Sequence, residues 1–94
     1  MKAIKVLLAD DHKIFREGII SLLKERKDIE IVGEAETGKE VIAILQKNEV
    51  DVVLLDINMP EMNGIDTAAI ILKQFPKSHI LVFSSYDDER FILK

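Results

Sequence analysis

Continuous apolar runs alternate along this chain with segments of helical periodicity, and this alternation narrows the possible folds more than any other feature. The runs that we expect to form strands are residues 4–9, 30–35, 51–55 and 80–83. A strand that is apolar at nearly every position is buried on both faces, which is typical of a parallel sheet with helices on both sides. Right-handed crossovers would connect successive strands. The sequence therefore predicts an α/β fold.

Helices are expected between the strands, because apolar residues recur there at helical spacing. A Thr37-Gly38 turn opens the second helix, and Phe75-Pro76 stops the third. The apolar sides that we expect to face the sheet are Ile14, Phe15, Gly18, Ile19, Leu22 and Leu23 in the first helix, Val41, Ile42, Ala43 and Leu45 in the second, and Ile65, Ala68, Ala69 and Leu72 in the third. A further helix is predicted to begin at Asp87.

Length, charge and cysteine content exclude several classes of protein. The chain has 94 residues, enough for one small domain. A formal net charge of −4 argues against direct binding of nucleic acid, which needs a basic face. The chain has no cysteine, so disulfides and thiolate metal sites are excluded. No stretch is long and apolar enough to span a membrane, and the apolar N-terminus is too short for a signal peptide. We therefore expect a cytoplasmic protein.

Acids and hydroxyls follow three of the predicted strands. Asp10 and Asp11 follow the first, Asp56 the third, and Ser84 and Ser85 the fourth. Ligands of open α/β sheets bind beyond the carboxyl ends of the strands. These side chains should therefore converge at one rim of the sheet.

Taken singly, these residues also have purely structural interpretations. The interpretations are a helix cap for Asp10 or Asp11, an Asx turn for Asp56, caps for Ser84 and Ser85, and a simple turn for Met59-Pro60. Caps do not explain a second adjacent acid and a third acid on the neighbouring strand. Crowded carboxylates raise one another's pKa and cost stability unless a cation lies among them.

An all-oxygen ligand set suits a hard cation such as Mg²⁺. Aspartate is also a known nucleophile on phosphorus, where it forms an aspartyl phosphate. A bound cation and a nearby ammonium would screen the charge of the transferring group. The rim could therefore carry out phosphoryl chemistry.

Three stretches carry a family resemblance: "LLADDH", "VVLLDINMPEMNG" and "ILVFSSYDD". They resemble the receiver domain of bacterial two-component response regulators. "DDHKIFREGIISLL" and "IEIVGEAETGKE" further resemble the LuxR-type, DNA-binding branch of that family. The resemblance covers the whole chain and implies a flavodoxin-like receiver fold with strand order 2-1-3-4.

The resemblance implies a role for each acidic position. Asp56 matches the phosphoacceptor, which takes a phosphoryl group from a histidine kinase. Asp11 matches the direct Mg²⁺ ligand, and Asp10 lies beside it as a ligand through water or as a supporting partner. The backbone carbonyl of Asn58 matches the position that completes the metal site.

The resemblance also assigns the two serines and the turn. Ser84 matches the switch hydroxyl that turns toward the phosphoryl group, and Ser85 matches the adjacent small residue that admits the phosphodonor. Pro60 and Gly64 shape the loop, since proline fixes φ and glycine allows a positive φ or a close approach.

The match stops before the end of the family pattern. The expected domain is 1–94, an incomplete receiver that lacks most of the fourth helix, the fifth strand and the fifth helix. Its output domain is absent as well. The fifth strand normally supplies a lysine that pairs with the phosphoryl group, and Lys5, Lys13 and Lys94 do not occupy that place.

Loss of these elements should expose Phe15, Ile19 and Leu22 on the first helix and leave residues 80–83 as a bare edge. We therefore expect a homo-oligomer built on one of these surfaces, with Asp56 outside the contact.

The leading interpretation is a signalling receiver rather than an enzyme, which controls transcription through a DNA-binding output domain. One alternative is a chemically silent assembly fragment. Another is an Asp-nucleophile phosphatase of the haloacid-dehalogenase type, which Asn58 weakens because that family has an acid there. Dinucleotide binding is excluded, since no Gly-rich turn follows the first strand.

Overall fold

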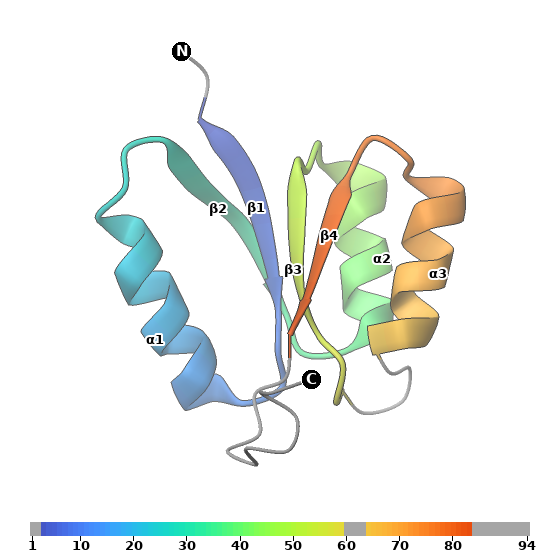
Figure 1. Cartoon of the computed structure of the whole chain (residues 1–94), viewed down its shortest axis with the longest axis horizontal. Helices are drawn as coiled ribbons and strands as arrows, with labels where there is room; N and C mark the ends of the chain where they lie inside the picture. Colours follow the sequence, from blue (N-terminus) through green and yellow to red (C-terminus); the bar gives the residue numbers. More distant parts are fainter. Residues whose placement is uncertain (1–2, 60–63, 84–94) are drawn as a thin grey trace.

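Four strands and three helices alternate along the chain in the computed structural model, which describes residues 3–59 and 64–83 (Figure 1). The elements are β1 (Ile4–Ala9), α1 (Lys13–Lys24), β2 (Ile29–Ala35), α2 (Gly38–Lys47), β3 (Val52–Asp56), α3 (Gly64–Gln74) and β4 (His79–Phe83). The four strands lie where they were predicted, to within one residue at each end.

The strands form one parallel sheet in the order β2-β1-β3-β4, which confirms the prediction. Between the two central strands, Val6 pairs with Val52 and Ala9 pairs with Leu55. This register makes the carboxyl ends of β1 and β3 level with each other. The residues that follow, Asp10 and Asp56, are therefore placed side by side at the rim.

Helices cover both faces of the sheet, with α1 on one side and α2 and α3 together on the other (Figure 1). Side chains alternate between these faces along each strand. Leu7 and Ala9 of β1, with Val53 and Leu55 of β3, join the main hydrophobic core against α2 and α3. Val6 and Leu8 are also buried, but they lie outside that cluster, as expected for the face toward α1.

The face of α3 that packs on the sheet differs from the predicted one. Ile65 and Leu72 are 68% and 66% exposed, whereas Thr67 and Ile71 are completely buried. Thr67 and Ile71 lie three and seven residues after Gly64, so the three share one side of the helix. Gly64 is itself buried, so its side of the helix packs on the sheet. Of the predicted face, Ile65 and Leu72 point outward, whereas Ala68 is partly buried against the core.

The other two helices need smaller corrections. In α2, Val41 and Leu45 are buried as predicted, but Ala43 is exposed. In α1, Ile14 is 86% exposed, so it does not pack on the sheet as predicted. Both helices therefore expose an apolar residue that the periodicity placed on the buried face.

Apolar side chains are exposed on the surfaces where we expected exposure. On α1, Leu22 is largely exposed and Phe15 is 39% exposed, whereas Ile19 is half-buried. On β4, which is the edge strand next to β3, Leu81 and Val82 are 59% and 43% exposed. Within residues 3–59 and 64–83, none of the helices has both the length and the apolar character needed to cross a membrane.

Candidate functional site

Two buried carboxylates meet at the carboxyl rim of the sheet. Asp10 directly follows β1 and Asp56 is the last residue of β3, and both side chains are completely shielded from solvent. Each follows a strand residue, Ala9 or Leu55, that belongs to the main core. The alternation along the strands therefore turns both carboxylates toward the opposite face.

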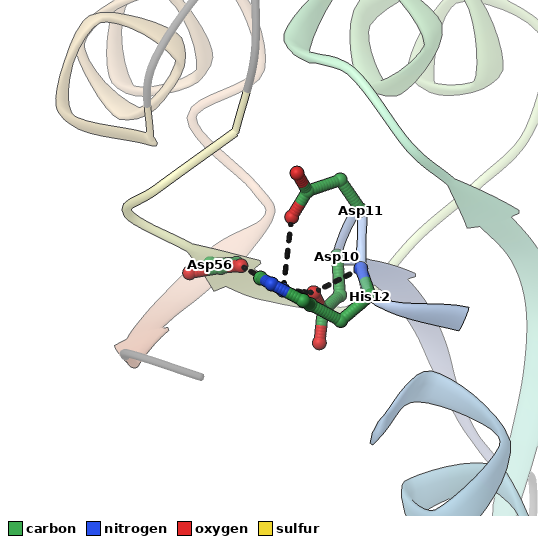
Figure 2. A group of neighbouring side chains, drawn as sticks. All are labelled: Asp10, Asp11, His12 and Asp56. Atoms are coloured by element: carbon green, nitrogen blue, oxygen red, sulfur yellow. Dashed lines mark hydrogen bonds and ion pairs between the residues drawn. The ribbon is translucent and has the colours of Figure 1, made fainter. Parts of the chain in front are cut away.

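The turn after β1 adds a third acid and an imidazole to this site. The backbone N–H of His12 donates to Asp10 Oδ1 over 2.9 Å, which closes the turn. Asp11 is partly exposed, with 30% of its side chain accessible. Figure 2 shows the ring of His12 reaching toward Asp56, with Asp11 and Asp10 on either side. One ligand atom from each of the four residues lies within 4.8 Å of the others.

The structure decides between the structural interpretations of the acids. His12, rather than Asp10 or Asp11, is the N-cap residue of α1, and its side chain makes no capping hydrogen bond. Asp10 accepts the backbone N–H of this N-cap residue instead. Asp56 does form an Asx turn, because its Oδ1 accepts the backbone N–H of Asn58 over 3.0 Å. Fixing one oxygen in this way also orients the Asp56 carboxylate.

The Asp10 carboxyl is electrostatically strained. Burial raises its pKa above the ordinary range, and the neighbouring Asp56 raises it further, while the hydrogen bond from His12 opposes the shift. In the described part of the chain, two buried carboxylate oxygens, Asp10 Oδ2 and Asp11 Oδ1, accept no hydrogen bond. Buried oxygens without donors are costly unless a cation satisfies them.

Comparison with known proteins identifies the family of this chain. The model of the response regulator receiver domain matches residues 6–94. The transcriptional regulatory protein YhcZ of Bacillus subtilis is 39% identical over 89 residues, which are 95% of this chain and 42% of YhcZ. This chain belongs to the response regulator receiver family.

Solved structures agree in both sequence and fold. The receiver domain of NarL from Mycobacterium tuberculosis is 30% identical with a TM-score of 0.85, over 99% of this chain and 75% of that one. RcsB, solved as two dimers bound to two parallel DNAs, is 30% identical with a TM-score of 0.84 over 93% of this chain and 47% of RcsB. The chain spans less than half the length of the curated relatives that it matches.

Receiver domains are signalling domains rather than enzymes, which excludes the phosphatase alternative. They bind Mg²⁺ at their acidic phosphorylation site and work with histidine kinases. The residues present in this receiver suit such an ion. The three acids offer oxygen ligands, and two of their buried oxygens have no hydrogen-bond donor within residues 3–59 and 64–83.

Sequence reasoning missed Arg16, which is the one buried residue of α1 and is only 8% exposed. Its Nη1 donates to the backbone carbonyl of Asp10 over 2.5 Å, and its Nε donates to Glu34 Oε1 over 3.0 Å. The guanidinium therefore ties α1 and β2 to the acidic turn of the receiver. A charged residue within an amphipathic helix was the available signal, but its main partner is a backbone carbonyl, which no sequence pattern reveals.

Met59 after β3 and Gly64 at the start of α3 both pack against the domain. Met59, for which a simple turn was one interpretation, is 6% exposed and belongs to the main core. Gly64 fits the close-approach alternative, because a Cβ there would lie 2.5 Å from the Asp56 carbonyl oxygen. The start of α3 is therefore in close contact with the backbone of Asp56.

The remaining predicted positions are only partly placed. Asn58 lies two residues after Asp56 and is partly buried, as the turn requires. Ser84, Ser85 and Pro60 lie outside the described residues, as does the helix predicted to begin at Asp87.

Proposed function

We propose that this receiver takes a phosphoryl group on Asp56 from a histidine kinase, with Mg²⁺ bound beside it, and thereby controls a DNA-binding output domain and transcription. One observation carries the proposal. Asp56 is held at the end of β3 next to Asp10 and Asp11, and among the described residues Asp10 Oδ2 and Asp11 Oδ1 accept no hydrogen bond.

The surroundings of each acid suggest its role. Asp11 is the most accessible of the three, which suits a direct ligand of an ion that enters from solvent. Asp10 is completely buried, which suits a ligand through water or a supporting charge. The Asn58 backbone carbonyl would complete the site. When bound, Mg²⁺ supplies positive charge that offsets the charge of the transferring group.

The Asx turn prepares Asp56 for nucleophilic attack. The N–H of Asn58 holds Oδ1, and Oδ2 faces the side of the site where His12 lies, with 4.0 Å between Oδ2 and His12 Nδ1. In the transfer, an Asp56 oxygen bonds to phosphorus while the bond from phosphorus to the kinase imidazole breaks. The imidazole leaves with the bonding electrons and takes up a proton from solvent.

The switch and the output are proposed from the family resemblance. Ser84 would bond the new phosphoryl group and Ser85 would leave room for its donor, so that the charge change at Asp56 biases a second conformation. RcsB binds DNA as dimers. By analogy, we propose that this receiver controls the pairing of DNA-binding output domains, with a self-contact that leaves Asp56 outside.

The test is phosphorylation by a small acyl phosphate, read by intact mass with and without Mg²⁺. Wild-type protein should gain one phosphoryl group only when Mg²⁺ is present, and Asp56→Asn should gain none. Asp51→Asn is the matched control, because Asp51 stands at the opposite end of β3 and is exposed. Labelling of Asp56→Asn would refute the acceptor, and a folded but unlabelled wild type would favour the silent assembly alternative.

A further inference from the structure

The imidazole of His12 lies inside the acidic site rather than beside it. Its Nδ1 is 3.1 Å from Asp11 Oδ1, 3.4 Å from Asp10 Oδ1 and 4.0 Å from Asp56 Oδ2 (Figure 2). The side chain is 48% exposed, so its inward orientation does not result from burial in the core. The role proposed for the three acids makes no use of this nitrogen.

The spacing of these atoms is that of ligands around a single ion. Transition ions hold nitrogen and oxygen ligands at about 2.0–2.2 Å. Adjacent ligands then lie roughly 2.8–3.1 Å apart in an octahedral site and 3.3–3.6 Å apart in a tetrahedral one, and opposite ligands of an octahedron lie about 4.0–4.4 Å apart. The distances from His12 Nδ1 to Asp11 and Asp10 fall in the ranges for adjacent ligands. The distance to Asp56 falls at the edge of the range for opposite ligands.

The backbone holds His12 in this position. The backbone N–H of His12 donates to Asp10 Oδ1, and the backbone carbonyl of Asp10 in turn accepts a hydrogen bond from the buried Arg16. Asp10 Oδ2 is completely buried and, among the described residues, accepts no hydrogen bond. The site thus combines an oriented nitrogen with a buried carboxylate oxygen that lacks a donor, and both observations point to a cation.

We infer that His12 is a metal ligand, which makes this receiver's acidic site a mixed nitrogen and oxygen site that binds a divalent transition ion more tightly than Mg²⁺. The inference rests on the proposed function, since it uses the same three acids. Mg²⁺ prefers oxygen ligands alone, whereas imidazole favours the later first-row ions such as Co²⁺ and Zn²⁺. His12 would therefore determine which ion the site selects.

The test compares Co²⁺ and Mg²⁺ binding in wild-type protein, His12→Ala and His79→Ala. Co²⁺ reports its own ligands through visible absorption, and Mg²⁺ affinity can be measured by calorimetry. His79 is the chain's only other histidine and is an exposed residue at the start of β4, so its variant is a matched control.

Wild-type protein should bind Co²⁺ more tightly than Mg²⁺. His12→Ala should weaken Co²⁺ binding by about tenfold or more and change its spectrum, with Mg²⁺ affinity little changed. His79→Ala should match wild type. Equal loss of both ions in His12→Ala, or unchanged Co²⁺ binding, would overturn the inference. If His12→Ala does not fold, Zn²⁺ added to wild type must shift the NMR signals of the His12 ring and leave those of His79 in place.

The two proposals fail separately. If Asp56 is labelled in the presence of Mg²⁺ but Co²⁺ binding does not depend on His12, only the inference about His12 is refuted. If Co²⁺ binding requires His12 but the protein is never labelled at Asp56, only the proposed phosphoacceptor function is refuted.

Discussion

Gly64→Ala should displace the backbone of Asp56, the proposed phosphoacceptor. The added Cβ would lie 2.5 Å from both the Asp56 carbonyl oxygen and Ile57 Cα, and 3.0 Å from the Asp56 carbonyl carbon. Carbon atoms in contact prefer about 3.5–4.0 Å, so a shift of roughly 1 Å is required. All three neighbouring atoms belong to the backbone, so no side-chain rotation can relieve the clash.

Overpacking of this kind costs about 1–3 kcal/mol. For a domain of this size each kcal/mol lowers Tm by about 4–8 °C. The hydrogen bond from Gly64 N–H to the Ile57 carbonyl, 3.1 Å long, lies at the same contact and should lengthen. Because Asp56 must move with its own carbonyl, Mg²⁺ affinity should fall as well.

Urea unfolding with and without Mg²⁺ measures both effects. Gly18→Ala is the matched control, because the residue is exposed in the middle of α1 and a Cβ there would meet no other part of the described structure within 4 Å. That change should stabilise the protein by about 0.5–1 kcal/mol. Wild-type stability and wild-type Mg²⁺ affinity in Gly64→Ala would refute the close-approach argument.

Three further changes test other contacts. Arg16→Met leaves the Asp10 carbonyl without its donor, so urea unfolding should show a loss of about 1–3 kcal/mol, whereas Arg16→Lys should retain part of the stability. The raised pKa of Asp10 means that its protonated form stabilises the metal-free fold below about pH 4, a contribution lost as pH rises through the folded-state pKa. Without metal, Asp10→Asn should therefore be more stable than wild type at pH 7, with a gap that closes in acid; an unchanged gap would refute the burial argument. Leu81→Lys on the β4 edge should reduce self-association in light scattering, while Leu72→Lys on α3, similarly exposed, should not.

The sheet and its acidic rim could be predicted because both depend on local patterns. Apolar runs define the strands, and carboxylates placed directly after β1 and β3 must share a rim in a parallel sheet. The face of α3 could not be predicted in this way, since Ile65 and Leu72 form a stripe as apolar as the one that packs. The choice depends on Gly64 fitting against the backbone of Asp56 and Ile57, which is a tertiary contact.

In the site, too, some residues could be predicted from local patterns and others could not. Asp10, Asp11 and Asp56 were identifiable from their places after the strands, and the structure brings them together. The inward orientation of His12 and the burial of Arg16 were not. Both depend on hydrogen bonds with Asp10, through its carboxylate and its carbonyl, that only the folded turn creates.

One aromatic pair connects α1 with the carboxyl end of β4, next to the residue that follows Asp56. The rings of Phe15 and Phe83 stack with centroids 5.7 Å apart, and the Phe83 carbonyl accepts the N–H of Ile57, the residue after Asp56. The chain contains no tryptophan. Phe15→Trp would therefore install a single indole fluorophore whose emission responds to movement of the β4 end, an optical readout of signalling that requires no partner protein.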